Sequence, residues 1–194
     1  MSKLPWPTEQ PTLHADGIRL RPWRADDADA VHTACQDRDI QRWTTVPVPY
    51  GPDAADALVR TVAPQQWQAH TGALFAVTST DNSSDRDGAD SADAGVLASC
   101  GLVCVDADER VAEVGYWAAP WARGRGVMRR AVRLLAEWAT TEGGLDRLEL
   151  YVDVENHPSR ALARAIGASE EGVLRKKALH RGERRDMVLY ALLA

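Results

Sequence analysis

The segment from Gly115 to Met128 constrains the fold of this chain more than any other. An apolar, strand-like run passes into a turn rich in glycine and arginine, and a helical apolar pattern follows. The apolar positions of that pattern are Val127, Ala131, Leu134, Leu135 and Trp138. Unpaired N–H groups at the start of such a helix bind anions, and Gly124 and Gly126 would let the backbone approach a phosphate closely. The segment therefore predicts a strand–turn–helix unit with an anion site.

Four arginines crowd the predicted start of this helix, where cations oppose the helix dipole. They are Arg123, Arg125, Arg129 and Arg130. A bound polyphosphate would resolve that conflict, and a solvated arginine face is the alternative. The P-loop pattern is absent, and a dinucleotide fingerprint would need glycine or alanine where Arg129 stands.

The rest of the chain alternates between strand and helix patterns. Strands are predicted at 17–23, 74–78, 95–105, 111–118, 147–154, 173–179 and 187–193. Helices are predicted at 24–35, 53–67, 126–141 and 158–166. The predicted apolar face of the second helix is Ala54, Leu58, Val62 and Trp67. This order predicts an α/β (α+β) domain with one mixed sheet covered by helices, spanning 1–194.

Three segments fall outside this pattern. Residues 1–12 form a Pro-rich N-terminal arm, and three prolines break regular structure in 43–52. Residues 81–94 read as an acidic loop insertion; they lack the Asp-x-Asp-x-Asp-Gly frame of a calcium loop.

Composition narrows the class of protein. The chain has 194 residues and a net charge of −5, which fits one domain and disfavours a general nucleic-acid binder. No apolar run is long enough to span a membrane, and residues 1–7 have no signal-peptide core, so a cytoplasmic protein is expected. Cys35, Cys100 and Cys104 have no metal-ligand spacing and are expected to be buried free thiols, without a disulfide.

The run Arg-x-x-Gly-x-Met, Arg123 through Met128, resembles the pyrophosphate loop of the GNAT superfamily of acyl-CoA-dependent N-acyltransferases. Met128 departs from the small residue usual there. Further segments resemble the RimJ/RimL-like branch, the ribosomal-protein N-terminal acetyltransferase type. They are Glu113–Trp117 with Pro120, Asn156–Ser159 with Gly167, Glu171–Arg175, and Arg181 to Tyr190. The resemblance covers nearly the whole chain apart from the arm and the insertion.

The resemblance implies a GNAT fold: a mostly antiparallel sheet of about seven strands, splayed between strands 4 and 5, with about four helices. It implies acetyl-CoA as co-substrate and no metal. Its pyrophosphate would lie on Arg123, Gly124, Arg125, Gly126, Val127 and Met128. The backbone around Val114, Tyr116 and Trp117 would hold the pantetheine arm, which Asn156 would contact.

Acetylation of an amine needs a base for its proton and a donor for the leaving thiolate. The resemblance makes Glu113 the first candidate base, with a strand Glu paired with an arginine as the alternative; Asp153 and Glu155 are further candidates. The tyrosine that many GNAT enzymes use as acid is replaced by Ala163. Ser159 is then the remaining donor near the thioester sulfur, unless it serves helix capping.

The acceptor side is less defined. Trp43, Pro47 and Tyr50 are expected to wall the acceptor pocket, with hydrophobic packing at the sheet edge as the alternative. His157 and His180 read as bystanders rather than bases. An acidic residue that some ribosomal-protein enzymes of this type carry in the sixth strand corresponds here to Ala178.

The predicted function is acetyl transfer from acetyl-CoA to a primary amine by direct attack in a ternary complex. The acceptor is either the N-terminal α-amine of a protein or peptide, or a small amine. A non-catalytic acyl-CoA-binding module and a ribosome- or RNA-associated factor using the basic hairpin at 175–185 are the alternatives. The exposed edge of the last hairpin would allow a homodimer.

Overall fold

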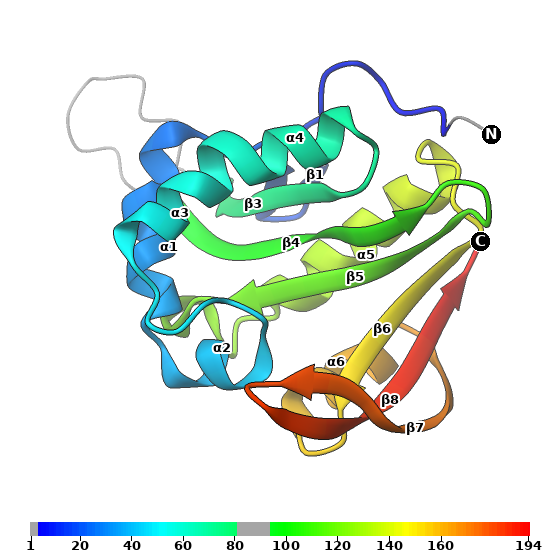
Figure 1. The fold of residues 1–194 in the computed structure, drawn as a ribbon. Helices are drawn as coiled ribbons and strands as arrows, with labels where there is room; N and C mark the ends of the chain where they lie inside the picture. Colours follow the sequence, from blue (N-terminus) through cyan, green and yellow to red (C-terminus); the bar gives the residue numbers. More distant parts are fainter. Residues whose placement is uncertain (1–3, 81–93) are drawn as a thin grey trace.

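A computed structural model describes residues 4–80 and 94–194, which form one mixed sheet with helices on both faces (Figure 1). The eight strands of the described residues lie in the order β1-β2-β3-β4-β5-β6-β8-β7. They are β1 (Leu13–Ala15), β2 (Ile18–Arg21), β3 (Ala73–Ser79), β4 (Ala94–Asp106), β5 (Val111–Ala118), β6 (Arg147–Asp153), β7 (Ser169–His180) and β8 (Glu183–Leu193). Seven of them match the predicted strands.

The parallel pair β5–β6 is the point where the sheet opens. Val111, Ala112 and Glu113 pair with Arg147, Leu148 and Glu149, and no pairing continues beyond them in the described sheet. All other neighbours are antiparallel. In Figure 1 β5 and β6 diverge from this paired end toward α2 and α6. The predicted splay is confirmed.

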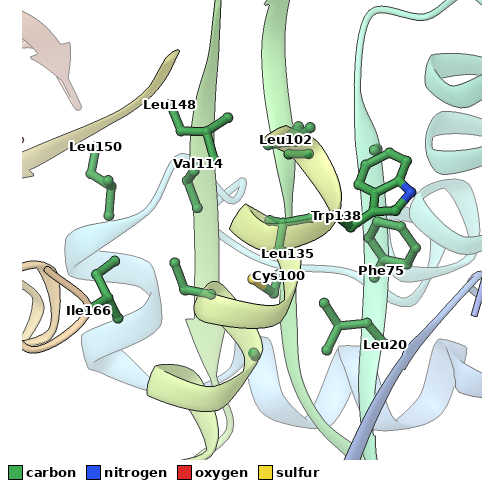
Figure 2. Close-up of a cluster of buried hydrophobic side chains, with 14 of the residues drawn as sticks. Leu20, Phe75, Cys100, Leu102, Val114, Leu135, Trp138, Leu148, Leu150 and Ile166 are labelled. Atoms are coloured by element: carbon green, nitrogen blue, oxygen red, sulfur yellow. The ribbon is translucent and has the colours of Figure 1, made fainter. Parts of the chain in front are cut away.

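The helix α5 (Val127–Thr141) covers one face of the sheet, and α6 (His157–Ala165) packs beside it against β6 and β7. Leu135 and Trp138 of α5 lie among strand residues such as Phe75 and Leu102 (Figure 2). β6 buries alternate residues beginning at Leu148, as predicted. This core fixes the start of α5 against the end of β5.

The opposite face is covered by α1 (Ala28–Cys35), α3 (Pro52–Ala57), the π-helical turn η2 (Leu58–Val62) and α4 (Ala63–Gln68). Three of the four residues predicted for the apolar face of this second helix are displaced by one position, and Trp67 is buried as predicted. The buried positions are Ala55, Val59, Ala63 and Trp67. Val62 is 38% exposed. The rows Ala54–Leu58–Val62 and Ala55–Val59–Ala63 both repeat every four residues, so the pattern alone could not choose between them.

Two elements lie outside the prediction. The strand β1 forms a hairpin with β2 across Asp16-Gly17, a dipeptide that favours such turns. The short helix α2 (Arg38–Trp43) begins at Asp37, whose carboxylate accepts the N–H groups of Asp39 and Ile40 at 3.0 Å. Six residues are too few for a helical apolar pattern to be recognised.

The described part of the N-terminal arm is packed rather than loose. Leu4 and Trp6 are buried, and Trp6 stacks on Trp67 with ring centroids 4.9 Å apart. The Trp6 indole N–H donates to the carbonyl of Gly143 at 2.9 Å, which attaches the arm to the loop after α5.

The cysteine prediction holds in part. Cys35, Cys100 and Cys104 are free thiols, and the first two are buried. Cys104 is exposed, against expectation, because the register of β4 and β5 shifts after Val103 and Cys104 has a φ of +50°. The predicted acidic insertion lies outside the described residues except for Ala94, the first residue of β4. No helix in the described ranges is long and apolar enough to cross a membrane.

Candidate active site

The turn between β5 and α5 has the shape predicted for an anion loop. After the short helix η3 (Pro120–Ala122), Gly124 and Gly126 have φ values of +73° and +69°. A Cβ at Gly124 would meet nothing within 4 Å, so the space above this backbone is open. Gly126 is the N-cap of α5 and supplies no side-chain cap, which leaves the first N–H groups of the helix for a ligand. This cradle fits a pyrophosphate such as that of CoA.

Two residues of the predicted loop point their side chains into the protein. Val127 is 2% exposed, and Met128 is partly buried against the core that α5 forms with the sheet. These residues can meet a phosphate only through their N–H groups. Because the Met128 side chain packs inward, a residue larger than the usual glycine or alanine is accommodated without filling the cradle.

Arg123 binds acidic residues of the neighbouring helix. Its guanidinium lies 2.5 Å from the carboxylate of Asp37 and 3.3 Å from that of Asp39. Burial would raise the pKa of Asp37, but hydrogen bonds from Arg123 and from the backbone of α2 lower it overall. The Arg123 side chain therefore joins the loop to α2, and its charge is compensated before any ligand binds.

The inner part of the splay contains a contact between β5 and α6. The Tyr116 hydroxyl lies 2.6 Å from the Ser159 Oγ. Burial raises the pKa of Tyr116 to about 12, although the bond to Ser159 lowers it and Cys100 raises it further. At neutral pH both hydroxyls are protonated, so this pair can supply a proton to a thiolate.

Helix capping was the alternative role for Ser159, and in the structure Asn156 caps the helix instead. Its side-chain oxygen accepts the Ser159 N–H at 3.2 Å and begins α6. The cap is thus supplied by Asn156, and the Ser159 hydroxyl is free to contact Tyr116. Contact of Asn156 with pantetheine stays a prediction.

Glu113 is partly buried on β5, on the face opposite Val114 and Tyr116. Desolvation raises the pKa of its carboxyl; Lys177 lowers it and Glu149 raises it. Among the described residues Glu113 makes no ion pair within 4.0 Å. An elevated pKa and an unpaired carboxylate suit a general base.

Arg147 lies on β6 two residues before Glu149, the strand partner of Glu113, and is already paired with other acids. Arg147 donates to Glu149 at 2.7 Å and to Glu171 at 2.9 and 2.5 Å. The alternative in which Glu113 is the partner of an arginine is therefore not what the structure has.

The other two candidate bases are engaged. The Asp153 carboxylate accepts the N–H of Glu155 at 2.8 Å. The Glu155 carboxylate lies 3.4 Å from Arg42 and 3.8 Å from Arg185. Both carboxylates already have partners within the protein, so Glu113 is the less engaged of the three candidates.

Of the residues predicted to wall the acceptor pocket, Tyr50 is buried in the core and Trp43 is only partly buried. Tyr50 is 5% exposed and packs in the core under α1 and α3, with its hydroxyl against Cys35. Trp43 is partly buried at the end of α2, and the Arg42 guanidinium lies 4.3 Å above its ring. Tyr50 thus shows the packing alternative, and Trp43 remains a candidate wall.

The sequence did not indicate two features of the site. One is the phenol of Tyr116, because its contact with Ser159 joins residues that are 43 positions apart in the chain. The other is an arginine-rich pocket of about 420 Å³ between α2 and the β7–β8 turn, which brings together residues from three parts of the chain. The described residues contain no group of three or more His, Cys, Asp or Glu that could hold a metal ion.

A splayed parallel strand pair beside an uncapped, glycine-flanked helix start defines an acyl-CoA-dependent acyltransferase. The acetyltransferase (GNAT) domain model matches residues 18–169, and the chain belongs to this family. The predicted fold, family and acetyl-CoA-dependent class are confirmed.

Relatives agree with this assignment. "Putative ribosomal N-acetyltransferase YdaF" of Bacillus subtilis is 37% identical over 97 residues, a match that spans 48% of this chain and 53% of that protein. Mycobacterium smegmatis RimJ in complex with CoA-disulfide has a TM-score of 0.77 at 24% identity, covering 100% of this chain and 90% of that one. RimL, a ribosomal L7/L12 α-N-protein acetyltransferase in complex with CoA, has a TM-score of 0.80 at 16% identity, covering 94% and 98%.

Proposed function

We propose that this protein transfers the acetyl group of acetyl-CoA to the N-terminal α-amine of a protein or peptide, through a ternary complex. The observation that carries the proposal is the opening of β5 from β6 after Glu113, directly beside the anion loop. A pantetheine arm hydrogen-bonds well to strand backbone that has lost its neighbour. The protein relatives named for ribosomal substrates favour an α-amine acceptor over a small amine.

The reaction needs one proton removed from the amine and one delivered to sulfur. The amine nitrogen forms the new bond to the acetyl carbon while the carbon–sulfur bond breaks. In the proposal Glu113 takes the amine proton, directly or through water, because its raised pKa brings it closer to that of the amine. Ser159 gives its proton to the leaving thiolate and takes one from Tyr116; Glu113 then releases its proton to solvent, and solvent restores the Tyr116 hydroxyl.

The oxyanion that forms during attack needs a donor as well. After Glu113, β5 keeps β4 as its partner on one side, and the backbone N–H groups on its other side face the splay, where no strand pairs with them in the described sheet. An N–H at Tyr116 or Trp117 would stabilise the developing charge.

The test measures acetyl transfer and co-substrate binding separately. Peptides with a free N-terminus, the same peptides with a blocked N-terminus and an internal lysine, and small amines are incubated with acetyl-CoA and analysed by mass spectrometry. The proposal expects transfer to the free α-amine. Isothermal titration with acetyl-CoA and with CoA runs beside it.

Tight acetyl-CoA binding without transfer to any amine would favour a non-catalytic binding module. Transfer to small amines alone would overturn the choice of a peptide acceptor. Transfer to the internal lysine alone would overturn the choice of the α-amine.

A further inference from the structure

The pocket between α2 and the β7–β8 turn is rich in positive charge. Its walls include Arg38 and Arg42 of α2, and Arg181 and Arg185 at the hairpin, with Glu183 as the acidic wall residue. The chain as a whole has a net charge of −5, so this concentration of arginine runs against the overall sign. A local positive pocket on an acidic protein suits a specific anion rather than general attraction to polyanions.

One of these arginines holds the pocket together. Arg181 donates to the carbonyls of Gln41 at 2.7 Å and Val46 at 3.2 Å. These bonds join the hairpin turn to α2 and to the loop after it, and Figure 1 shows the hairpin tip beside α2. These hydrogen bonds therefore hold α2 and the β7–β8 turn, the two elements that form the pocket, in a fixed position relative to each other.

The other three arginines of the pocket have guanidinium N–H groups that are not used in the contacts found. Arg38 is exposed and has no hydrogen bond or ion pair within the described ranges. Arg42 and Arg185 share the carboxylate of Glu155, at 3.4 and 3.8 Å, and Arg185 also binds Glu183 at 2.9 Å. Each guanidinium has five N–H donors, and these few carboxylate contacts use a minority of them.

Two nitrogens of the wall residues are also without a hydrogen-bond partner among the described residues. Arg185 Nε and His180 Nε2 are buried and have no hydrogen-bond partner in the part of the chain that the structure describes. A ligand that brings acceptor oxygens to this wall would correct the imbalance between donors and acceptors. Carboxylates match the planar guanidinium group best, because they can accept two parallel bonds.

Residues next to the pocket contact the anion loop on one side and lead into the cap of α6 on the other. Asp37, the cap of α2, binds Arg123 of the anion loop. Glu155, which contacts Arg42 and Arg185, directly precedes Asn156, the cap of α6. Figure 1 shows α2 and the tip of the β7–β8 hairpin, the two elements that line the pocket, at the open end between β5 and β6.

We propose that this pocket binds carboxylate side chains of the acceptor, so that the enzyme prefers peptides with acidic residues close behind the N-terminal amine. This inference rests on the proposed function and adds its substrate class. The acidic side chains would lie in this cavity of about 420 Å³, and the extended peptide would place its α-amine toward the splay.

The test compares three peptides of equal length that begin with alanine and continue with Glu-Asp-Glu, Gln-Asn-Gln or Lys-Lys-Lys. Steady-state kcat/KM is measured for each with wild type, Arg38→Gln, Arg42→Gln and the control Arg60→Gln. Arg60 is an exposed arginine on η2, paired with Asp56 and remote from the pocket. Acetyl-CoA binding is titrated for every variant.

The wild type is expected to favour the acidic peptide over the neutral one by about tenfold or more, since one charged hydrogen bond changes binding by that order. Arg38→Gln and Arg42→Gln should each reduce the acidic-to-neutral ratio severalfold, and Arg60→Gln should leave it unchanged. Acetyl-CoA binding should be the same in all four proteins.

Equal kcat/KM for the acidic and neutral peptides in the wild type would overturn the inference while leaving the proposed function intact. The inference would also be overturned if Arg60→Gln reduced the preference for the acidic peptide as much as Arg38→Gln does. Absence of transfer to all three peptides would count against the proposed function itself. RNA binding that abolishes peptide transfer would assign the pocket to a polyanion instead.

Discussion

The hydroxyl groups of Tyr116 and Ser159 lie 2.6 Å apart and join β5 to α6 across the splay. Tyr116 is held by the core on one side and Ser159 by the Asn156 cap on the other. The contact is thus set by two rigid elements, which is the arrangement that efficient proton transfer needs.

Removing either hydroxyl is expected to lower kcat. Ser159→Ala should reduce kcat by about 10²-fold, at the lower end for a lost general acid, with little change in acetyl-CoA binding. Tyr116→Phe should have a smaller effect if it acts through Ser159, and the double variant should lose no more than Ser159→Ala alone. Independent, additive losses would show that the two groups do not act as a pair.

Glu113→Gln is expected to lower kcat/KM by about 10²-fold or more. It should also remove the acid-side limb of the pH profile, in which the rate rises as the base ionises. In the wild type this limb should rise through a pKa above the usual glutamate value, because burial disfavours the ionised carboxylate. The measurement is kcat/KM from pH 5 to 9 for both proteins. An identical profile in the variant would exclude Glu113 as the base.

Glu113→Gln, which is expected to lower activity, should raise the stability of the fold at neutral pH. The folded-state pKa of Glu113 is raised, so its contribution to stability is fully present below the unfolded pKa and is lost as pH rises through the folded pKa. Glu113→Gln should therefore be more stable than the wild type at neutral pH and equal to it at acid pH. Urea unfolding at the two pH values would measure this.

The sequence predicted the layered fold because its signals are local. The apolar alternation in β6 and the glycine turn before α5 are each contained within a few residues. The anion loop was predictable for the same reason, since Gly124 and Gly126 need only their own backbone conformation.

The features that escaped prediction depend on distant partners. The ion pair of Arg123 with Asp37 joins residues 86 positions apart and was not expected, while contact of Arg123 with the pyrophosphate stays a prediction. Tyr50 was predicted to line the acceptor pocket, but the core under α1 and α3 buries it. The partner of each of these side chains depends on which helices and strands pack together in the fold. The spacing of residues in the sequence does not show that packing.

Gly124→Ala tests whether the loop backbone holds the co-substrate. Gly124 has a φ of +73°, where a Cβ costs roughly 1–2 kcal/mol, although this Cβ would meet no protein atom. The variant should fold with a modest loss of stability but bind acetyl-CoA at least about tenfold more weakly. Gly167→Ala is the control, since it has a φ of +92°, equally open surroundings and lies after α6. Equal acetyl-CoA binding by the two variants would refute the cradle.

Asp27→Ala is expected to destabilise the fold without a specific effect on the site. Arg21 and Asp27 form a buried bidentate pair at 2.7 Å, and Asp27 also accepts the Arg24 N–H at 2.8 Å. Breaking a buried pair from one side costs about 3–5 kcal/mol. Replacing both partners, with Arg21→Met and Asp27→Leu, should cost less than Asp27→Ala alone. Chemical denaturation of the three proteins gives the comparison.

Asp37 offers a way to separate the cap of α2 from its link to the anion loop. Asparagine caps helices about as well as aspartate, so Asp37→Asn should keep α2 but lose the ion pair with Arg123. Asp37→Ala should lose both and cost about 1 kcal/mol more in unfolding free energy. If Arg123 serves mainly to hold α2, Asp37→Asn should raise the KM for the peptide acceptor severalfold while the acetyl-CoA Kd changes by less than about twofold, since a half-exposed pair contributes up to ~1 kcal/mol. A tighter acetyl-CoA complex in Asp37→Asn would instead mean that the released guanidinium reaches the pyrophosphate, and that Asp37 competes with the co-substrate for it.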